Sequence, residues 1–262
     1  MTRVILGVLL LSAGFRGVFA AELKPETLRA FDLYVKEREA ALSHRIRSGP
    51  FLWSDESPDR ARRVKGGEVV INGRDGGVHE IKSGLVHDWS GAVFIPGATL
   101  KQVLDLVQNY DNHKNIYDPE VVDSKLRNRN GNDFHIHLRL LKKKVLTVVL
   151  NTEHDVRYFA LDATRVHSRS YSRKIAELDD AGTQQERELP PGKDHGFLWR
   201  LNSYWRFQER DGGVYVECEA ISLTRGIPMG LGWMITPIIR DLPRESLEKT
   251  LNATRDAVRG GG

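Results

Sequence analysis

The Asp211-Gly212 dipeptide, within the stretch SYWRFQERDGGVYVECEAISLTRGIPMGLGWM (203–234), constrains the fold of this chain more than any other feature. Asp-Gly favours the two-residue turn of a β-hairpin. Counting outward from such a turn places Arg206 opposite Glu217, and apolar residues mostly opposite apolar ones, as cross-strand pairs prefer. The predicted pairs are Phe207–Val216, Trp205–Cys218, Ser203–Ala220, Arg206–Glu217 and Tyr204–Glu219.

Alternate residues of this hairpin fall on two faces. One face carries the pairs Arg206–Glu217 and Tyr204–Glu219, which we interpret as exposed pairs worth about 0.2–1 kcal/mol each. The other face sets bulky residues on the first strand opposite small residues on the second. That contrast fits a tightly packed core, and it equally fits a cavity for an apolar ligand. The residues of this second face are Trp199, Leu201, Ser203, Trp205, Phe207, Val216, Cys218, Ala220, Ser222 and Thr224.

The first 20 residues have the parts of a secretory signal peptide. Arg3 precedes an apolar run from Val4 to Ala13, and Val18 and Ala20 suit the positions before a cleavage site. A retained membrane anchor is the alternative, although the run is about half the ~20 residues that span a bilayer. We expect residues 1–20 to be removed and the protein to be exported, to the periplasm or beyond.

Charge and cysteine content exclude some classes of partner and of cross-link. The chain has 39 Lys+Arg and 35 Asp+Glu, a net charge of +4 that falls by two without the signal peptide. A positive charge this small does not indicate binding to nucleic acid, so we predict no nucleic-acid partner. The lysine run 142–144 is interpreted as a solvated loop tip, with transient contact to anionic membrane lipids as the alternative. Cys218 is the single cysteine, so no intramolecular disulfide forms and the core alone must hold an exported fold.

Hydrophobic periodicity and turn residues predict mixed secondary structure. Thr99 and Gln102 match a helix capping box, and Pro25 suits the first turn of a helix. The predicted elements are a helix over 25–47, a connector over 48–68, a hairpin within 68–81, strands over 84–95, 133–140, 145–153 and 165–178, a loop over 179–195, and a helix over 243–258. This order predicts an α+β fold with one curved antiparallel sheet and the last helix laid across it.

Two segments resemble bacterial members of the START-like (SRPBCC, helix-grip) superfamily. The first is HDWSGAVFIPGATLKQVLDLVQNYDNHKNIYDPEV. The second is WRFQERDGGVYVECEAISLTRGIP followed by GWMITPIIRDLPRESLEKTLNATRDAV. The resemblance implies a START-like domain over residues 80–262, preceded by a helix and connector over 21–79.

The resemblance also implies a ligand site between the sheet and the C-terminal helix. The cavity wall would be the inner-face residues of the hairpin, and the segment Ile227–Met234, with Met229 and Trp233, would be a flexible entrance. The occupant would be a hydrophobic small molecule or lipid, bound without catalysis. We therefore predict no cofactor and no catalytic residue.

Metal and nucleophile chemistry is weakly supported by the sequence. His135 and His137 share a strand face, and His154 or His167 could add a third ligand, but no cysteine or spaced carboxylate completes a metal set. We interpret that face as exposed and polar. Cys218 has no adjacent base in the predicted register and is interpreted as a buried thiol. No metal site is predicted.

Two other classes of function remain open from the sequence. A cyclase or hydrolase acting in the same cavity would need polar groups facing the substrate, and Ser203, Ser222 and Thr224 are the candidates. An envelope assembly factor would use the N-terminal segment as a docking arm. Exposed Phe51 and Trp53 would favour the second class, and burial of both would weaken it.

Overall fold

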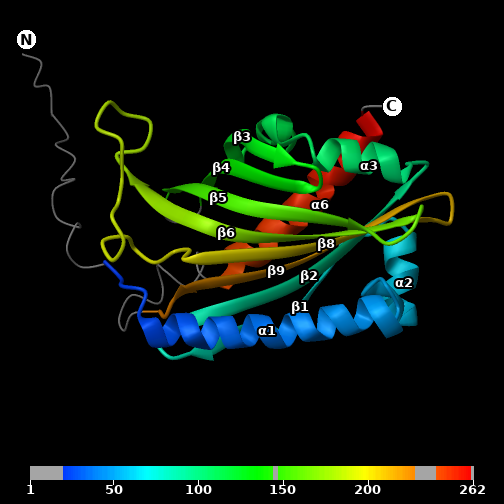
Figure 1. The fold of residues 1–262 in the computed structure, drawn as a ribbon, viewed down its shortest axis with the longest axis horizontal. Helices are drawn as coiled ribbons and strands as arrows, with labels where there is room; N and C mark the ends of the chain where they lie inside the picture. Colours follow the sequence, from blue (N-terminus) through cyan, green and yellow to red (C-terminus); the bar gives the residue numbers. More distant parts are fainter. Residues whose placement is uncertain (1–19, 144–146, 228–239, 261–262) are drawn as a thin grey trace, which may run out of the picture.

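The computed structural model describes residues 20–143, 147–227 and 240–260. Nine antiparallel strands form a curved sheet in the order β1-β2-β9-β8-β6-β5-β4-β3, with β7 beside β6 (Figure 1). The strands are β1 Val70–Ile81, β2 Gly84–Pro96, β3 Val121–Asn130, β4 Asp133–Lys143, β5 Thr147–Ala160, β6 Arg165–Asp179, β7 Arg187–Glu188, β8 Arg200–Arg210 and β9 Gly213–Arg225. The described helices are α1 Pro25–Ser48, α2 Pro58–Lys65, α3 Leu100–Val107, α4 His113–Ile116 and α6 Leu242–Gly260.

The β8–β9 hairpin has the predicted register. Arg210 pairs with Gly213, and the pairing continues outward through Arg206–Glu217 to Ser203–Ala220. Asp211 and Gly212 both have positive φ, as the two-residue turn requires. β9 also pairs with β2 along its whole length, so the hairpin lies inside the sheet rather than at an edge.

Helix α6 lies across one face of the sheet, called here the concave face (Figure 1). Leu247 and Leu251 of α6 pack with Val93, Phe207 and other inward-facing strand residues. A Cβ atom built on Gly91 of β2 would lie 2.5 Å from the Leu251 side chain. The missing side chain therefore lets the helix approach the strand closely. The predicted helix-grip arrangement is confirmed.

Helix α1 packs on the opposite, convex face of the same strands (Figure 1). Its buried Phe31, Val35 and Leu42 lie in one cluster with Ile221 and Leu223 of β9. The other side of α1 is exposed, so its amphipathic stripe points to the sheet. No helix in the described ranges is long and apolar enough to cross a membrane.

The prediction of a hairpin within 68–81 is wrong. These residues form the single strand β1, which pairs with β2 and shifts register between Gly73 and Val78. The extra residues bulge where the ring of Trp89 lies against Gly73 and Gly77, and a Cβ on Gly77 would lie 2.4 Å from that ring. The glycines thus provide space for an indole rather than a chain reversal. Residues 70–79, which the sequence grouped with the N-terminal connector, belong to the sheet.

Two helix starts follow the sequence signals. Thr99 and Gln102 form the predicted capping box at α3, because each side chain bonds to the backbone of the other. The predicted connector 48–68 contains the short helix α2, whose first turn is capped by Ser57.

Candidate functional site

A cavity of about 290 Å³ lies between the concave face and α6. Strands β4, β5, β6, β8 and β9 supply one wall, and Leu242, Leu247 and Thr250 of α6 supply part of the other. Most of the lining is aliphatic or aromatic. Small-molecule sites in proteins are typically apolar hollows of about 300–1,000 Å³ with a few polar groups, so this cavity lies at the small end of that range.

The hairpin supplies one side of this cavity. Ala220 is only half-buried although it lies in the middle of a central strand, because it faces the open space. The residues of the predicted inner face that line the cavity are Leu201, Ser203, Trp205, Phe207, Cys218, Ala220, Ser222 and Thr224. That they bind a ligand stays a prediction.

Other members of the predicted set lie elsewhere. Trp199 precedes β8, and its indole N–H donates to Asp194 at 3.0 Å. The Trp199 ring packs in the α1 cluster, on the convex side. The prediction had extended the inward–outward alternation of β8 to Trp199, but this residue lies before the strand begins, where the alternation does not apply. Val216 is fully buried in the core, in one cluster with α3 and α6, and is not a cavity residue. Met229 and Trp233 lie outside the described residues.

The part of the strand wall that lies beyond β6 was not assigned from the sequence. β4 and β5 contribute Ile136, Leu138, Leu140, Val148, Leu150, His154, Val156 and Tyr158. Alternation had placed the three β4 residues on one face, but it could not bring that face opposite the β8–β9 hairpin. That contact depends on the strand order, in which β6 and β5 separate β8 from β4.

Two pairs of hydroxyl groups bond to each other where they line the cavity or its back wall. Tyr110 and Tyr158 join their phenol oxygens at 3.0 Å, and Tyr117 meets the Thr254 hydroxyl at 3.2 Å. Burial raises the pKa of Tyr117 to about 12. These phenols are therefore neutral at physiological pH and contribute ring surface and hydroxyl groups rather than charge.

One end of the cavity is polar. Lys142 of β4 and Ser246 of α6 both line it, as does Glu120, which precedes β3. The Lys142 ammonium group donates to the Glu120 carboxylate and to the Ser246 hydroxyl, the latter at 2.8 Å. Lys142 thus differs from the predicted solvated loop tip, because Glu120 and α6 draw its side chain inward. Lys144 lies outside the described residues.

The histidines and the cysteine near the cavity are uncharged. Burial lowers the pKa of both His113 and His154 to about 4, so both rings are neutral near pH 7. His113 bonds to the Val107 carbonyl and His154 to the Thr152 hydroxyl, rather than to a cavity serine. Burial also raises the pKa of the Cys218 thiol well above its usual value.

Thr224 is the cavity hydroxyl that does meet a histidine: its Oγ1 lies 2.9 Å from Nε2 of His87, whose pKa burial lowers to about 4. In the described part of the chain the other ring nitrogen of His87 has no hydrogen-bond partner, so no third group orients this base.

The His135–His137 face is polar and partly exposed. His135 contacts Asp155 at 3.1 Å and Glu153 at 3.7 Å. Within the described ranges, no group of three or more His, Cys, Asp and Glu side chains is arranged to hold a metal ion. His154 does not join this face, because it lines the cavity on the other side of the sheet.

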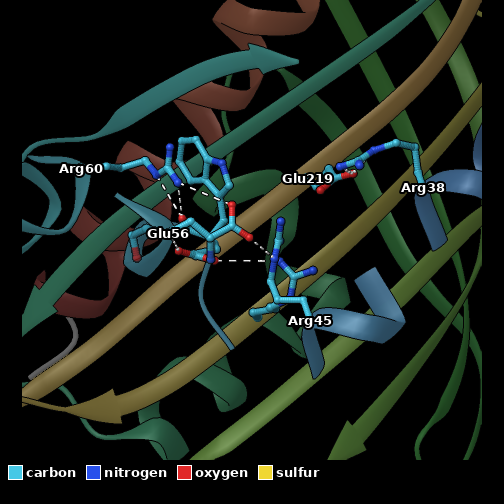
Figure 2. Close-up of polar contacts among 9 residues, drawn as sticks. Arg38, Arg45, Glu56, Arg60 and Glu219 are labelled. Atoms are coloured by element: carbon cyan, nitrogen blue, oxygen red, sulfur yellow. Dashed lines mark hydrogen bonds and ion pairs between the residues drawn. The ribbon is translucent and has the colours of Figure 1, made fainter. Parts of the chain in front are cut away.

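The outward pairs of the hairpin are buried, which corrects the prediction that they are exposed. Arg206, Glu217, Tyr204 and Glu219 are each 3% exposed or less, because α1 and the segment after it cover them. Arg38 of α1 donates to Glu219 at 2.8 Å (Figure 2). The Arg38 guanidinium also lies 3.0 Å from Asp88 of β2. Burial raises the pKa of Asp88 and of Glu219, although Arg38 opposes the shift.

A second part of this convex network fixes the turn before α2. The Glu217 carboxylate accepts hydrogen bonds from the backbone N–H groups of Trp53, at 2.6 Å, and Ser54, at 2.8 Å. Arg60 donates to the Trp53 carbonyl, and Arg45 contacts Glu56 at 2.6 Å (Figure 2). A carboxylate of β9 therefore holds the segment that follows α1.

Phe51 and Trp53 are buried within this cover, at 6% and 8% exposure. They pack with Val70, Phe94 and Tyr215 on the convex face. This burial weakens the assembly-factor alternative, which needed both residues to be exposed.

Comparison with solved structures finds folds similar to this chain. A STAR-related lipid transfer protein from Xanthomonas axonopodis is 17% identical, with a TM-score of 0.47, over 74% of this chain and 99% of that one. A START superfamily protein from Mycobacterium smegmatis is 11% identical, with a TM-score of 0.43, over 67% and 99%. The Zhui aromatase/cyclase from a Streptomyces species is 13% identical, with a TM-score of 0.40, over 66% and 94%.

No family model matches the sequence, and neither does any curated protein. At identities this low no residue role is carried over to the present chain. The helix-grip fold rests on the sheet and on α6 as described above, and the site rests on the contacts of this chain's own residues.

Proposed function

We propose that this protein binds a hydrophobic small molecule or a lipid between the concave face and α6. The observation that carries the proposal is the apolar cavity of about 290 Å³ between the strands and α6. A soluble domain gains stability by filling such a space, so a hollow of this size lined by Leu, Val and aromatic side chains is best explained by an occupant. The STAR-related lipid transfer protein from Xanthomonas axonopodis has a similar fold.

Binding without catalysis is the form of this function that the contacts favour. Of the candidate hydroxyls Ser203, Ser222 and Thr224, Thr224 contacts His87 at 2.9 Å, but in the described part of the chain the other ring nitrogen of His87 has no partner that would orient it as a base. A cyclase-type activity, as the name of the Zhui aromatase/cyclase states for that protein, is the alternative. Incubation with a hydrophobic candidate followed by mass spectrometry separates the two, because binding returns the ligand unchanged.

The test of binding is a thermal-unfolding screen of the delipidated protein against fatty acids, phospholipids, quinones and isoprenoids. A ligand that binds only the folded state stabilises it by RT ln(1 + [L]/Kd), about 2.7 kcal/mol at a hundredfold excess over Kd. We expect at least one class to raise the unfolding temperature, and the same class to appear in mass spectra of material that co-purifies. A flat response to all four classes would contradict the proposal.

We further propose that the protein is exported after cleavage behind Ala20. The composition of residues 1–20 motivates this. The Ala21 nitrogen, which cleavage would turn into the amino terminus, donates to the Asp194 carbonyl at 2.8 Å. Intact-mass analysis of protein expressed with its leader should give a chain that begins at Ala21, and recovery of the full-length chain would contradict export.

A further inference from the structure

The polar end of the cavity carries information about the ligand. Lys142 and Glu120 are only 19% and 14% exposed, and both line the same hollow as the apolar walls. The residues around them are Val121, Leu140, Val148 and Leu150. An ammonium group in such a place loses its hydration, and an ion pair there adds little net stability to the fold.

The side chains of this cluster do not use all their hydrogen-bonding groups on one another. Glu120 accepts from Lys249 at Oε1, at 2.8 Å, and from both Lys142 and Ser246 at Oε2. Lys142 donates to Glu120 and Ser246, which accounts for two of its three N–H groups among the described residues. Glu120 therefore accepts three of the roughly four hydrogen bonds open to a carboxylate, and one Lys142 N–H is left among the described residues. This end can still offer an occupant the N–H of a charged donor.

Two further charged residues of the described ranges, Lys249 and Glu245, lie near this end but do not line the cavity. Lys249 is 58% exposed and does not line the hollow. Glu245 lies close enough to raise the pKa of Lys249, so it balances that outer lysine. Among the described lining residues, Lys142 is therefore the lysine or arginine that faces the apolar space. Burial lowers its pKa despite Glu120, so a second anionic partner would stabilise its charged form.

We infer that the occupant is a single-chain amphiphile whose carboxylate head contacts Lys142, while its apolar chain lies along the β4, β5 and hairpin walls. This inference rests on the proposed function of the cavity. A carboxylate supplies the acceptor that the ammonium group lacks, and charge-assisted hydrogen bonds are the stronger ones. A volume at the small end of the ligand range favours one chain over the two of a phospholipid.

The test is a series of ligands that share one chain and differ only in the head: dodecanoate, methyl dodecanoate, dodecanol, dodecylamine and dodecyl phosphate. Each is titrated calorimetrically, below its micelle concentration, into delipidated protein. We expect dodecanoate to bind about tenfold or more tightly than dodecanol or the ester, because a hydrogen bond to a charged group is worth more than a neutral one. Dodecylamine should bind most weakly, since its cation would meet Lys142.

Two variants separate the proposed contact from general electrostatics. Lys142→Met keeps the apolar stem and removes the ammonium group, so dodecanoate should fall to the affinity of dodecanol while dodecanol keeps its own. Lys249→Met is the matched control, because it removes a lysine bound to the same Glu120 from outside the cavity. It should preserve the preference for dodecanoate. Thermal unfolding checks that both variants fold.

The outcomes distinguish this inference from the function on which it rests. Equal binding of all heads overturns the carboxylate assignment and leaves a hydrophobic site. Tighter binding of dodecylamine also overturns it, by making Glu120 the contact, and tighter binding of dodecyl phosphate overturns it in favour of a phosphate head. Failure of every amphiphile and of the wider screen removes the proposed function itself. If Lys142→Met does not fold, the affinities of the five dodecyl ligands for the native protein still test the carboxylate assignment.

Discussion

The two faces of the β8–β9 hairpin are both buried, but they are built from opposite kinds of chemistry. The concave face is apolar and leaves a hollow beside small residues such as Ala220. The convex face carries charges, with Glu217 and Glu219 bonded to α1 and to the turn after it. The charged groups of the hairpin are thus on the convex face, which α1 covers, and its apolar groups border the cavity on the concave face. The difference indicates that the convex face fixes the structure while the concave face is left available.

The largest effect should come from breaking the convex network at Arg38. Arg38→Met leaves Asp88 and Glu219 buried without their cation, and removing one partner of a buried ion pair costs about 3–5 kcal/mol. The free energy of unfolding, measured with urea at pH 7, should fall by this amount.

This loss should shrink as the pH falls. Both carboxyls have folded-state pKa values raised by burial, so they take up protons more readily in the folded chain than in the unfolded one. Their contribution is favourable at low pH and is lost as the pH rises through the folded pKa. A variant whose deficit is the same at pH 5 and pH 7 would show that these carboxyls are not the cause.

Adjacent positions of β9 should respond oppositely to a large side chain. Ile221 is fully buried under α1, so Ile221→Trp should overpack the convex face and cost about 3 kcal/mol. Ala220→Trp places the indole in the cavity, so stability should change little while ligand binding falls sharply. Urea unfolding and a ligand titration are measured on both. Strong destabilisation by Ala220→Trp, with binding intact, would show that the space at this position is already filled.

The concave face should show the reverse pH response through His154. Burial lowers its pKa to about 4, so below pH 6.5 the unfolded chain binds a proton before the folded chain does. That depressed pKa makes stability fall as the pH drops, by about 2 kcal/mol at pH 5. His154→Gln should remove this part of the slope in urea unfolding between pH 7 and pH 5. If the variant keeps the same slope, the loss of stability at low pH comes from the other histidines.

The smallest effect is expected from an ion pair that neither face buries. Arg62 and Asp59 of α2 pair on the surface, where Arg62 is 75% exposed. Arg62→Met should change the free energy of unfolding by less than about 0.5 kcal/mol, because solvent screens such pairs. This variant also controls for the loss of an arginine in Arg38→Met. If Arg62→Met lowered the free energy of unfolding as much as Arg38→Met, burial of the ion pair would not explain the large effect at Arg38.

The register of the hairpin could be predicted from the sequence, but the surroundings of its faces could not. The turn residues and the pair Arg206–Glu217 fix which side chains share a face. They do not say what covers that face, and the charges were assigned to solvent. The signal for a second cover was the other residues of the same parity: Ile221 and Leu223 are apolar and fully buried. A strand that is apolar on both parities is buried on both faces.

The cavity was predictable only on the side made by one hairpin. Ser203 and Ala220 are paired by a short turn, so local counting reaches them. Lys142 and Glu120 come together with Ser246 through the packing of α6 on the distant strands, which no local pattern encodes. Sequence alternation identifies which residues of one strand share a face. Which other strands line the same cavity depends on the strand order of the sheet.

The convex network also sets a delay during synthesis. Arg38 and its partner Glu219 are 181 residues apart in the chain. At about 5–20 residues added per second, the helix that carries Arg38 waits roughly 10–40 s before β9 exists to receive it. Through that interval Phe31, Val35 and Leu42 have no sheet to pack on. The apolar stripe of the α1 segment is therefore without its native partner for most of translation, and the native cover closes only when nearly the whole sheet has been made.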